Sequence, residues 1–532
     1  MRSLRAWWLA PWFLLLPMCG GKSGLYIDGA AGKAGATGSG ARGGAAGFAG
    51  SPSSGGRGGS KAGSGGGHLG GGAGAGSGGA GGSGTGGSGG NAEPICGNGV
   101  VELGESCDDG NQNAGDGCKA CVGIVELAAG EAHTCARLSD GTVRCWGGNE
   151  FGTLGLGDTE ARADQAAELG DALPEVELGA DTPLSLTARG WHTCAVLIGG
   201  FAKCWGNNAD GRLGLGDNMN HGDDPNEMGA NLPLLDLGLN GGVISLAAGS
   251  YHTCALLQFG KLKCWGNAEL GQLGLGSIDH RGDQPGEMGD ALQPVDLDAL
   301  VVAVSAGLYH NCAVLEQGNV KCWGNNGSGQ LGLGDTNYRG VFPNEMGENL
   351  LPLDLDGVAV AVTTGHYHSC ALLEGGSVKC WGGNFCGQLG LGDNEDRGDE
   401  LNEMGPALPV VDLDGSAVAV SAGATHTCAL LDDGRVKCWG CNDSGRLGLG
   451  DVLHRGDGPG EMGATLPAVD LGPNRTARAL VAGGGHSCAL LDNGLAKCWG
   501  GNNLGQLGLG DTAHRGDGPN EMGSELPNVL VP

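Results

Sequence analysis

The stretch "HTCALLDDGRVKCWG", His426 to Gly440, decides the fold of this 532-residue chain. An Asp-Asp-Gly turn separates two short apolar runs, a pattern typical of a β-hairpin. Cys428 and Cys438 stand on either side of the turn, ten residues apart. The stretch recurs seven times, and the first cysteine of each copy follows the previous one by 58 to 60 residues: Cys135, Cys194, Cys254, Cys312, Cys370, Cys428 and Cys488. Such a regular period is the signature of a repeat architecture.

Each repeat reads as strands and turns only. A "VAVSAG"-type run precedes the hairpin, and a "GQLGLGD" loop, a "HRGDGPNEMG" loop and an "LPxVDL" run follow it. The hairpin strands are apolar on both faces, which is typical of strands covered by sheets on both sides. Seven such sheets can close into a ring without apolar ends, so we predict an all-β fold, a seven-bladed β-propeller, over residues 123–532. We expect the last apolar run, residues 526–531, to complete the first blade.

The first 19 residues are predicted to be an export signal. Arg2 and Arg5 precede the run "AWWLAPWFLLLPMC", which is apolar but too short to span a bilayer. "LPMCGG" is similar to a lipobox with Cys19 as the lipidated residue, although Met18 stands where a small residue is usual. Either Cys19 carries a lipid anchor, or a cleavable signal removes it. In both cases we expect an exported protein, at the outer membrane and cell surface or extracellular, whose other cysteines meet an oxidising compartment.

A glycine-rich linker is predicted for residues 20–92. Residues 29–92 hold 31 glycines in 64 positions and almost no apolar side chains. Such a segment cannot offset its chain entropy by burial, so we expect a disordered tether with a mean end-to-end distance of about 40–50 Å. Residues 1–92 carry a net charge of +6 and the rest of the chain −36. A surface that acidic repels phosphate backbones, so we expect no nucleic-acid partner.

Residues 93–122 form a cysteine-rich module too short for a hydrophobic core. Its cysteines imply two disulfides, whose pairing the sequence leaves open: Cys96, Cys107, Cys118 and Cys121. The run "GESCDDGNxxxGDGC" resembles the cysteine-rich repeats of myxobacterial surface proteins, which implies a bacterial exported protein. A calcium site is one hypothesis, with candidate ligands Asp108, Asp109, Asn111, Asn113 and Asp116. The alternative is a metal-free knot, because Ala114 and Ala120 stand where an EF-hand loop needs Gly and Glu.

The repeated His-x-Cys-x9-Cys-Trp set allows three interpretations: metal ligands, reduced thiols or a disulfide. Cysteines opposed in a hairpin lie within disulfide reach, and export favours oxidation, so we predict seven hairpin disulfides and no metal. The pairs are Cys135–Cys145, Cys194–Cys204, Cys254–Cys264, Cys312–Cys322, Cys370–Cys380, Cys428–Cys438 and Cys488–Cys498. Cys386 and Cys441 occupy nearly equivalent positions in consecutive repeats, which predicts a disulfide between blades. We expect the repeated histidines to satisfy backbone groups inside their own blades.

The pattern "AGxxHxCALL…DGxVxCWGxNxxGQLGLG" resembles the regulator-of-chromosome-condensation repeat over about 410 residues. The resemblance implies a seven-bladed propeller. The namesake of that family is a nuclear nucleotide-exchange factor for the Ran GTPase, a role that does not fit an exported, acidic, cysteine-rich chain. The propeller-type β-lactamase inhibitory protein, a secreted relative by fold, binds an enzyme through one rim of its ring.

The residue before the repeated histidine varies between repeats. It is aromatic in four successive copies, Trp191, Tyr251, Tyr309 and Tyr367. An aromatic arc on one rim would suit binding to a protein or a glycan, and the alternative is local packing beneath neighbouring loops.

No enzyme motif is present in the sequence, so we predict no catalytic residue and, calcium aside, no cofactor. We expect a monomeric, surface-anchored module that binds another protein. The alternatives are an inhibitor of a secreted enzyme, a propeller lyase or glycan hydrolase, and, against the predicted compartment, a guanine-nucleotide exchange factor.

Overall fold

The structure is a computed structural model that describes residues 122–238 and 242–531. These residues form seven three-stranded antiparallel sheets and no α-helix. The predicted signal peptide with Cys19, the glycine-rich linker and the cysteine-rich module up to Cys121, with its calcium candidates, lie outside the described residues. Within the described ranges, no helix is long and apolar enough to cross a membrane.

Each repeat forms one sheet, and the all-β propeller prediction is confirmed. The strands are β1 (Ile124–Ala129), β2 (His133–Leu138), β3 (Val143–Gly147), β4 (Pro183–Arg189), β5 (His192–Leu197), β6 (Phe201–Gly206), β7 (Val243–Ala248), β8 (His252–Leu257), β9 (Leu262–Gly266), β10 (Val301–Ala306), β11 (His310–Leu315), β12 (Val320–Gly324), β13 (Ala359–Thr364), β14 (His368–Leu373), β15 (Val378–Gly382), β16 (Ala417–Ala422), β17 (His426–Leu431), β18 (Val436–Gly440), β19 (Ala477–Ala482), β20 (His486–Leu491) and β21 (Ala496–Gly500). Short 3-10 turns lie in the loops: η1 (Ala166–Glu168), η2 (Gly170–Ala172), η3 (Ala209–Gly211), η4 (Gln258–Gly260), η5 (Gly289–Ala291), η6 (Gly347–Asn349), η7 (Gly405–Ala407) and η8 (Gly463–Thr465).

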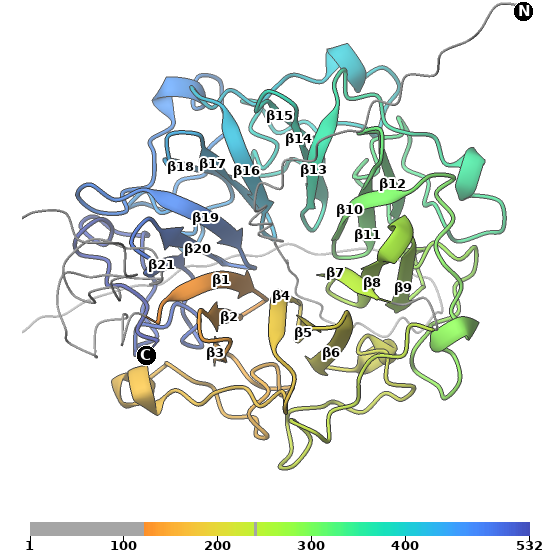
Figure 1. Cartoon of the computed structure of the whole chain (residues 1–532). Helices are drawn as coiled ribbons and strands as arrows, with labels where there is room; N and C mark the ends of the chain where they lie inside the picture. The colour runs from red at the N-terminus through yellow and green to blue at the C-terminus, as the bar shows by residue number, and fades with distance from the viewer. Residues whose placement is uncertain (1–121, 239–241, 532) are drawn as a thin grey trace, which may run out of the picture. The chain divides into compact units, whose positions relative to one another are not determined.

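The seven sheets stand as blades around a common centre, with the first strand of each blade innermost (Figure 1). In the blade that contains the quoted stretch, β16 pairs with β17 and β17 pairs with β18. Cys428 and Cys438 are direct partners across that hairpin. The first blade, β1–β3, lies beside the last, β19–β21, so the chain closes a ring (Figure 1).

A disulfide joins the second and third strands of every blade. All seven hairpin bonds listed above are present, each with a Cα–Cα distance of 4.1 Å. That spacing fits cysteines at a non-hydrogen-bonded pair of an antiparallel ladder, where side chains approach closely. An eighth bond joins Cys386 to Cys441 on consecutive blades, with a Cα–Cα distance of 5.0 Å. All sixteen cysteines of the described residues are therefore oxidised.

The hydrophobic core lies between blades and not within them. Trp439 of the sixth blade packs against Cys370 and Cys380 of the fifth, and it is fully buried. Its indole Nε1 donates a 3.0 Å hydrogen bond to the carbonyl oxygen of Gln388, also on the fifth blade. The tryptophans of the other six repeats are equally buried and donate to the equivalent carbonyl of the preceding blade. Each repeated Trp therefore fixes its blade to the previous one.

The repeated histidines also join blades, so the expectation that they act inside their own blades is wrong. Each imidazole Nε2 lies 2.8–3.0 Å from a side-chain oxygen on the next blade: His133 from Thr193, His192 from Thr253, His252 from Asn311, His310 from Ser369, His368 from Thr427, His426 from Ser487 and His486 from Thr134. A one-dimensional period shows that a residue recurs, but not that its partner lies one repeat further on.

The expectation for the last strand is also wrong. The amide of Val529 donates to the carbonyl oxygen of Ala496 in the seventh blade, as that of Val176 does to Val143 in the first. Each repeat therefore supplies the outer segment of its own blade. At the junction of the last and first blades, the side chain of Val529 packs with Ile124 and the amide of Gly170 donates to the carbonyl oxygen of Leu530, so side-chain and backbone contacts both close the ring.

Candidate functional site

One face of the ring is formed by the turns between the first and second strands, and we call it the aromatic face. These turns are residues 130–132, 190–191, 249–251, 307–309, 365–367, 423–425 and 483–485. The carbonyl of the residue before each histidine accepts a hydrogen bond from the loop after the third strand, as in Asn267 N to Tyr251 O at 2.9 Å. The turns and these loops therefore lie on the same side of the molecule. The repeat fixes the backbone, and the side chains differ from blade to blade.

Tyr251 and Tyr309, on the third and fourth blades, stack against each other on this face. Their rings are parallel, with centroids 4.7 Å apart and an interplanar angle of 1°. The guanidinium of Arg212 lies 4.9 Å from the centroid of Tyr251, a cation–π arrangement. Burial, and then Tyr251, raises the pKa of the Tyr309 hydroxyl, which stays neutral at physiological pH. The two blades thus present a fixed, partly exposed aromatic pair.

The other two predicted aromatics have different neighbours. Trp191 meets Phe151 edge to face at 5.7 Å, and Tyr367 meets Phe385 in the same way at 6.2 Å. The four residues lie at one equivalent position, as the repeats imply, but the structure gives three groups of rings in place of one continuous stack. Phe151 and Phe385 were not among the predicted aromatic residues. Both lie in the two variable positions between the repeated Asn and Gly of the loop after the third strand, so repeat-to-repeat variation there was the available signal.

A shallow cavity of about 250 Å³ adjoins Trp191. Three blades contribute to it: Leu504 from the seventh, Glu150 from the first and Trp191 from the second. Its remaining lining is Gly148, Asn149, Thr159 and Ala161. An apolar ring, an apolar side chain and a carboxylate at one depression suit an amphipathic group of a partner.

Near the ring axis, the aromatic face has a charged centre. Arg189 occupies the place that glycine holds in the other six repeats, and it is fully buried. Its Nη2 donates a 2.8 Å hydrogen bond to the carbonyl oxygen of Thr364, from the second blade to the fifth. Leu308 of the fourth blade and Ala424 of the sixth form a small apolar cluster with the tyrosine pair. The turns thus meet across the axis.

Glu131 provides the acidic group at this centre. Burial raises the pKa of its carboxyl well above the usual value, and the charges of Arg189 and Arg446 oppose that shift. Burial also lowers the pKa of the Arg189 guanidinium, while Glu131 opposes that change. Glu131 Oε2 and Arg189 Nε and Nη1 are shielded and have no hydrogen-bond partner in the described part of the chain. Glu131 and Arg189 therefore offset each other's charge, but some of their polar atoms make no hydrogen bond within the described residues.

The described residues contain no group of three or more His, Cys, Asp or Glu side chains arranged to hold a metal ion. The seven repeated histidines are each engaged with a neighbouring blade. What this face offers a partner is aromatic rings, apolar side chains and a few fixed charges.

A ring of seven self-contained blades, with variable side chains on a repeated frame, defines a repeat-built β-propeller. The chain belongs to the RCC1-like domain family, as its sequence resemblance implied: that domain matches residues 94–459, and a Regulator of chromosome condensation (RCC1) repeat matches residues 477–506. Members of this family act as protein-interaction or regulatory modules.

The relatives of this chain are proteins of different kinds. The chain is 28% identical over 407 residues to the ultraviolet-B receptor UVR8 of Arabidopsis thaliana, covering 74% of this chain and 80% of that protein. It is 31% identical over 357 residues to protein pim1 of Schizosaccharomyces pombe, covering 62% of this chain and 61% of pim1. The match to the probable human E3 ubiquitin-protein ligase HERC6 covers 51% of this chain and 25% of the ligase, at 32% identity.

Solved structures share the fold. Human WBSCR16 superimposes with a TM-score of 0.53 at 20% identity, covering 69% of this chain and 92% of that structure. Prp20p of Saccharomyces cerevisiae superimposes with a TM-score of 0.51 at 21% identity, covering 68% of this chain and 80% of that structure.

Proposed function

We propose that this chain is an exported, surface-anchored protein that binds another protein through its aromatic face and catalyses no reaction there. The observation that carries the proposal is the stacked pair Tyr251–Tyr309 with Arg212 over it, flanked by Trp191 and Tyr367 on neighbouring blades. Tyrosine, tryptophan and arginine are the residues that dominate the energetics of protein interfaces. Rigid rings lose little conformational entropy on binding, and these rings are held by the repeat.

The relatives support a protein partner. The Prp20p structure is described together with its binding to Gsp1p and histones, and yeast RCC1 (Prp20) has also been solved bound to Kap60. These partners belong to those proteins. The shared feature that we carry over is the use of a propeller as a binding surface.

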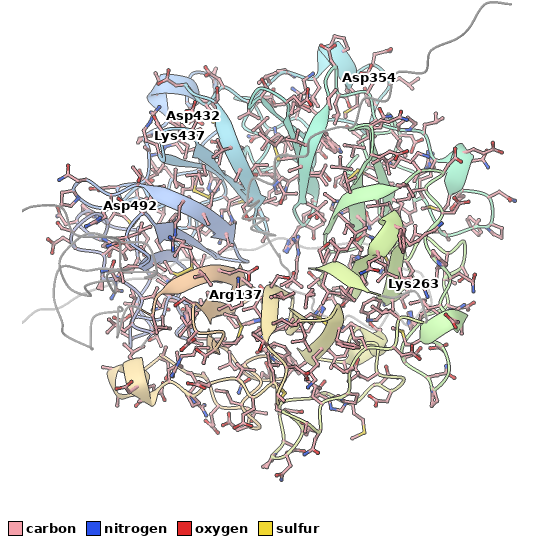
Figure 2. The ribbon with its side chains drawn as sticks, viewed as in Figure 1. Arg137, Lys263, Asp354, Asp432, Lys437 and Asp492 are labelled. Atoms are coloured by element: carbon pink, nitrogen blue, oxygen red, sulfur yellow. A yellow bond between two sulfur atoms is a disulfide. The ribbon has the colours of Figure 1, made fainter. Side chains whose placement is uncertain are left out.

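The distribution of basic residues supports a protein over a nucleic acid. Lys263 donates to the carbonyl oxygens of Leu237 and Gly289, and Lys437 donates to that of Gly463. Both lysines lie on third strands, in blades three and six, and burial lowers the pKa of each (Figure 2). These two lysines bond backbone carbonyls and are not available to phosphates, on a chain whose net charge is already −30.

Export is supported by the cysteines. Eight disulfides hold all sixteen cysteines of the described residues, which is typical of proteins that fold in an oxidising compartment. The lipid anchor at Cys19 and the location at the cell surface are part of the proposal.

Site-specific photocrosslinking tests the proposal. A photoreactive phenylalanine replaces Tyr251 in the full chain, and the matched control carries it at Phe342, an outer-loop residue that is 66% exposed. Both are irradiated with the envelope and medium fractions of the producing cells. We expect one discrete protein adduct from position 251, its loss in the Trp191→Ala/Tyr309→Ala/Tyr367→Ala background, and no such adduct from position 342. Equal labelling from both positions, or an adduct that survives the three substitutions, contradicts the proposal.

A further inference from the structure

The face opposite the aromatic face carries exposed apolar side chains over blades two to six, and they are densest over blades two to four, where Ile198, Phe201 and Phe259 stand in or beside the hairpin turns. This hairpin face is formed by the turns between second and third strands, residues 139–142, 198–200, 258–261, 316–319, 374–377, 432–435 and 492–495. Six residues form the apolar patch: Ile198 (58% exposed), Phe201 (52%), Ile244 (56%), Phe259 (80%), Leu300 (44%) and Val302 (54%). Apolar groups gathered on one face of a soluble domain mark an interaction site.

The patch is continuous between blades. The amide of Val243 donates to the carbonyl oxygen of Gly200, which places the start of β7 beside the turn of the second blade. Similarly, a Cβ on Gly260 would lie 2.8 Å from Cβ of Leu300, so the turn of the third blade touches the start of β10. The exposed side chains therefore follow one another along the face.

Phe259 at the centre of the patch is both exposed and strained. Its φ is +62°, in the left-handed region, where a bulky side chain is disfavoured. At the equivalent position of the second and fifth blades, the chain has the same left-handed backbone and glycine, Gly199 and Gly375. A phenylalanine at this position costs conformational energy, and nothing among the described residues covers its ring. Strain retained at an exposed aromatic residue points to a contact made outside these residues.

The chain that precedes the propeller arrives at this same face. The amide of Ser139, in the first hairpin turn, donates to the carbonyl oxygen of Gly123 at 3.0 Å, and the amide of Ile124 donates to that of Gly494 at 3.3 Å. Both contacts involve hairpin turns, so Gly123, near the start of the described residues, lies on the hairpin face of the first blade. The cysteine-rich segment, residues 93–121, directly precedes this point in the sequence.

We propose that the cysteine-rich segment docks on the apolar patch and covers Phe259. The segment has four apolar side chains close together, Ile95, Val100, Val101 and Leu103, and is too short to bury them in a core of its own. Val122 precedes the first blade, which neighbours the second blade, where the patch begins, so the segment is joined to the propeller close to the patch. A linked segment is present at an effective concentration in the mM range, so modest contacts keep it bound. This proposal is independent of the partner of the aromatic face.

The experiment uses the full oxidised chain, with a photoreactive phenylalanine at Phe259 and, as control, at Phe342. We expect an adduct that migrates as a monomer and that mass spectrometry maps from position 259 to residues 93–121. A dimer adduct would instead assign the patch to a second copy, and a lipid adduct with phosphatidylethanolamine–phosphatidylglycerol vesicles would assign it to a membrane. Either result, or labelling of residues 93–121 no stronger than from position 342, overturns the proposal.

A variant gives a second measurement. Phe259→Gly introduces the residue found at this position in the second and fifth blades. The hairpin should therefore keep its backbone conformation, and the propeller should keep its thermal stability. We expect hydrogen exchange of the amides of residues 95–103 to accelerate at least tenfold in this variant, while the strand amides of all blades are unchanged. Unchanged exchange in residues 95–103 overturns the proposal as well.

Discussion

His486 and Thr134 are 352 positions apart in the chain, yet the imidazole Nε2 and the hydroxyl Oγ1 lie 2.9 Å apart. Thr134 Oγ1 also donates to the carbonyl oxygen of Gln506 at 2.9 Å, so its hydroxyl accepts from His486 and the histidine carries its proton on Nε2. The same arrangement repeats with a Thr or Ser hydroxyl at five other junctions, and with the side-chain amide of Asn311 in place of the hydroxyl at the sixth. This contact is therefore the ordinary inter-blade bond, used once more to close the ring.

The first prediction concerns that closure. Thr134→Val removes the acceptor and leaves the buried Nε2–H of His486 unpaired, which should lower the free energy of unfolding by about 1–3 kcal/mol. Denaturant unfolding of the oxidised protein measures the change. The control is Thr142→Val, in an exposed hairpin turn where Thr142 bonds only Asp140 Oδ1 through its side chain; it should change the stability by less than about 0.5 kcal/mol. Equal effects of the two substitutions would contradict the role of the closing bond.

The second prediction concerns pH. Burial lowers the pKa of His133 and His368 to about 3 and that of His252 and His486 to about 4. In the unfolded chain these groups titrate near about 6.5, so below that pH the unfolded state binds protons that the folded state does not. The stability that they contribute is complete above about pH 6.5 and is lost as the pH falls towards 4, by about 1.4 kcal/mol per pH unit for each histidine.

Unfolding free energies at pH 7.5, 6, 5 and 4.5 check this dependence. His252→Gln retains an N–H donor for Asn311 and removes one titrating group, so its slope should be smaller by about 1.4 kcal/mol per pH unit. A slope equal to that of the unsubstituted protein would show that His252 is not held neutral in the fold.

The third prediction concerns the axial pair. Arg189→Gly installs the residue of the other six repeats, removes the bond to Thr364 and leaves Arg446 as the one remaining cation that opposes the raised pKa of the Glu131 carboxyl. We expect a loss of about 3–5 kcal/mol, as for other broken buried pairs. In the Glu131→Gln background the same substitution should cost at least about 1 kcal/mol less, because no charge is stranded. Additive effects in this double-mutant cycle would show that the two side chains are not coupled.

The fourth prediction concerns the disulfide between blades. Cys386 and Cys441 close a loop of 55 residues, so the Cys386→Ser/Cys441→Ser variant should lose about 3–4 kcal/mol by the chain-entropy model. Opening one hairpin, as in Cys428→Ser/Cys438→Ser, should cost less, about 2–3 kcal/mol, because its loop is shorter. Non-reducing peptide mapping of the unsubstituted protein checks the pairing, and free thiols at these positions would refute it.

The repeat made most of the fold predictable. Seven copies of one hairpin signal agree, so strand order, the turn positions and the opposition of Cys428 and Cys438 follow from local pattern alone. What failed was the assignment of neighbours. Val529 bonds within its own blade and His426 bonds to the next, and a period of about 59 residues does not distinguish one repeat from another.

The positions that form the candidate site could be predicted from the sequence, but the contacts between their side chains could not. Variation before the repeated histidine located Tyr251 and Tyr309, but their stacking depends on the distance between adjacent blades, which no sequence pattern encodes. Arg189 is the one departure from glycine at its position, and it was not predicted as part of the site. Its reach across the axis to Thr364 depends on ring closure, which becomes visible only in three dimensions.

The self-contained blade has a consequence for how this molecule could arise and change. Because no strand is exchanged between the first and last repeats, duplicating or deleting one whole repeat breaks no backbone pairing inside any remaining blade. Every junction uses the same tryptophan and histidine contacts, with a hydroxyl or the Asn311 amide as the histidine's partner, so a new neighbour would find its partners already in place. Unequal recombination between copies of the repeat would therefore yield folded rings, while substitutions at the seven turn positions altered what each ring binds.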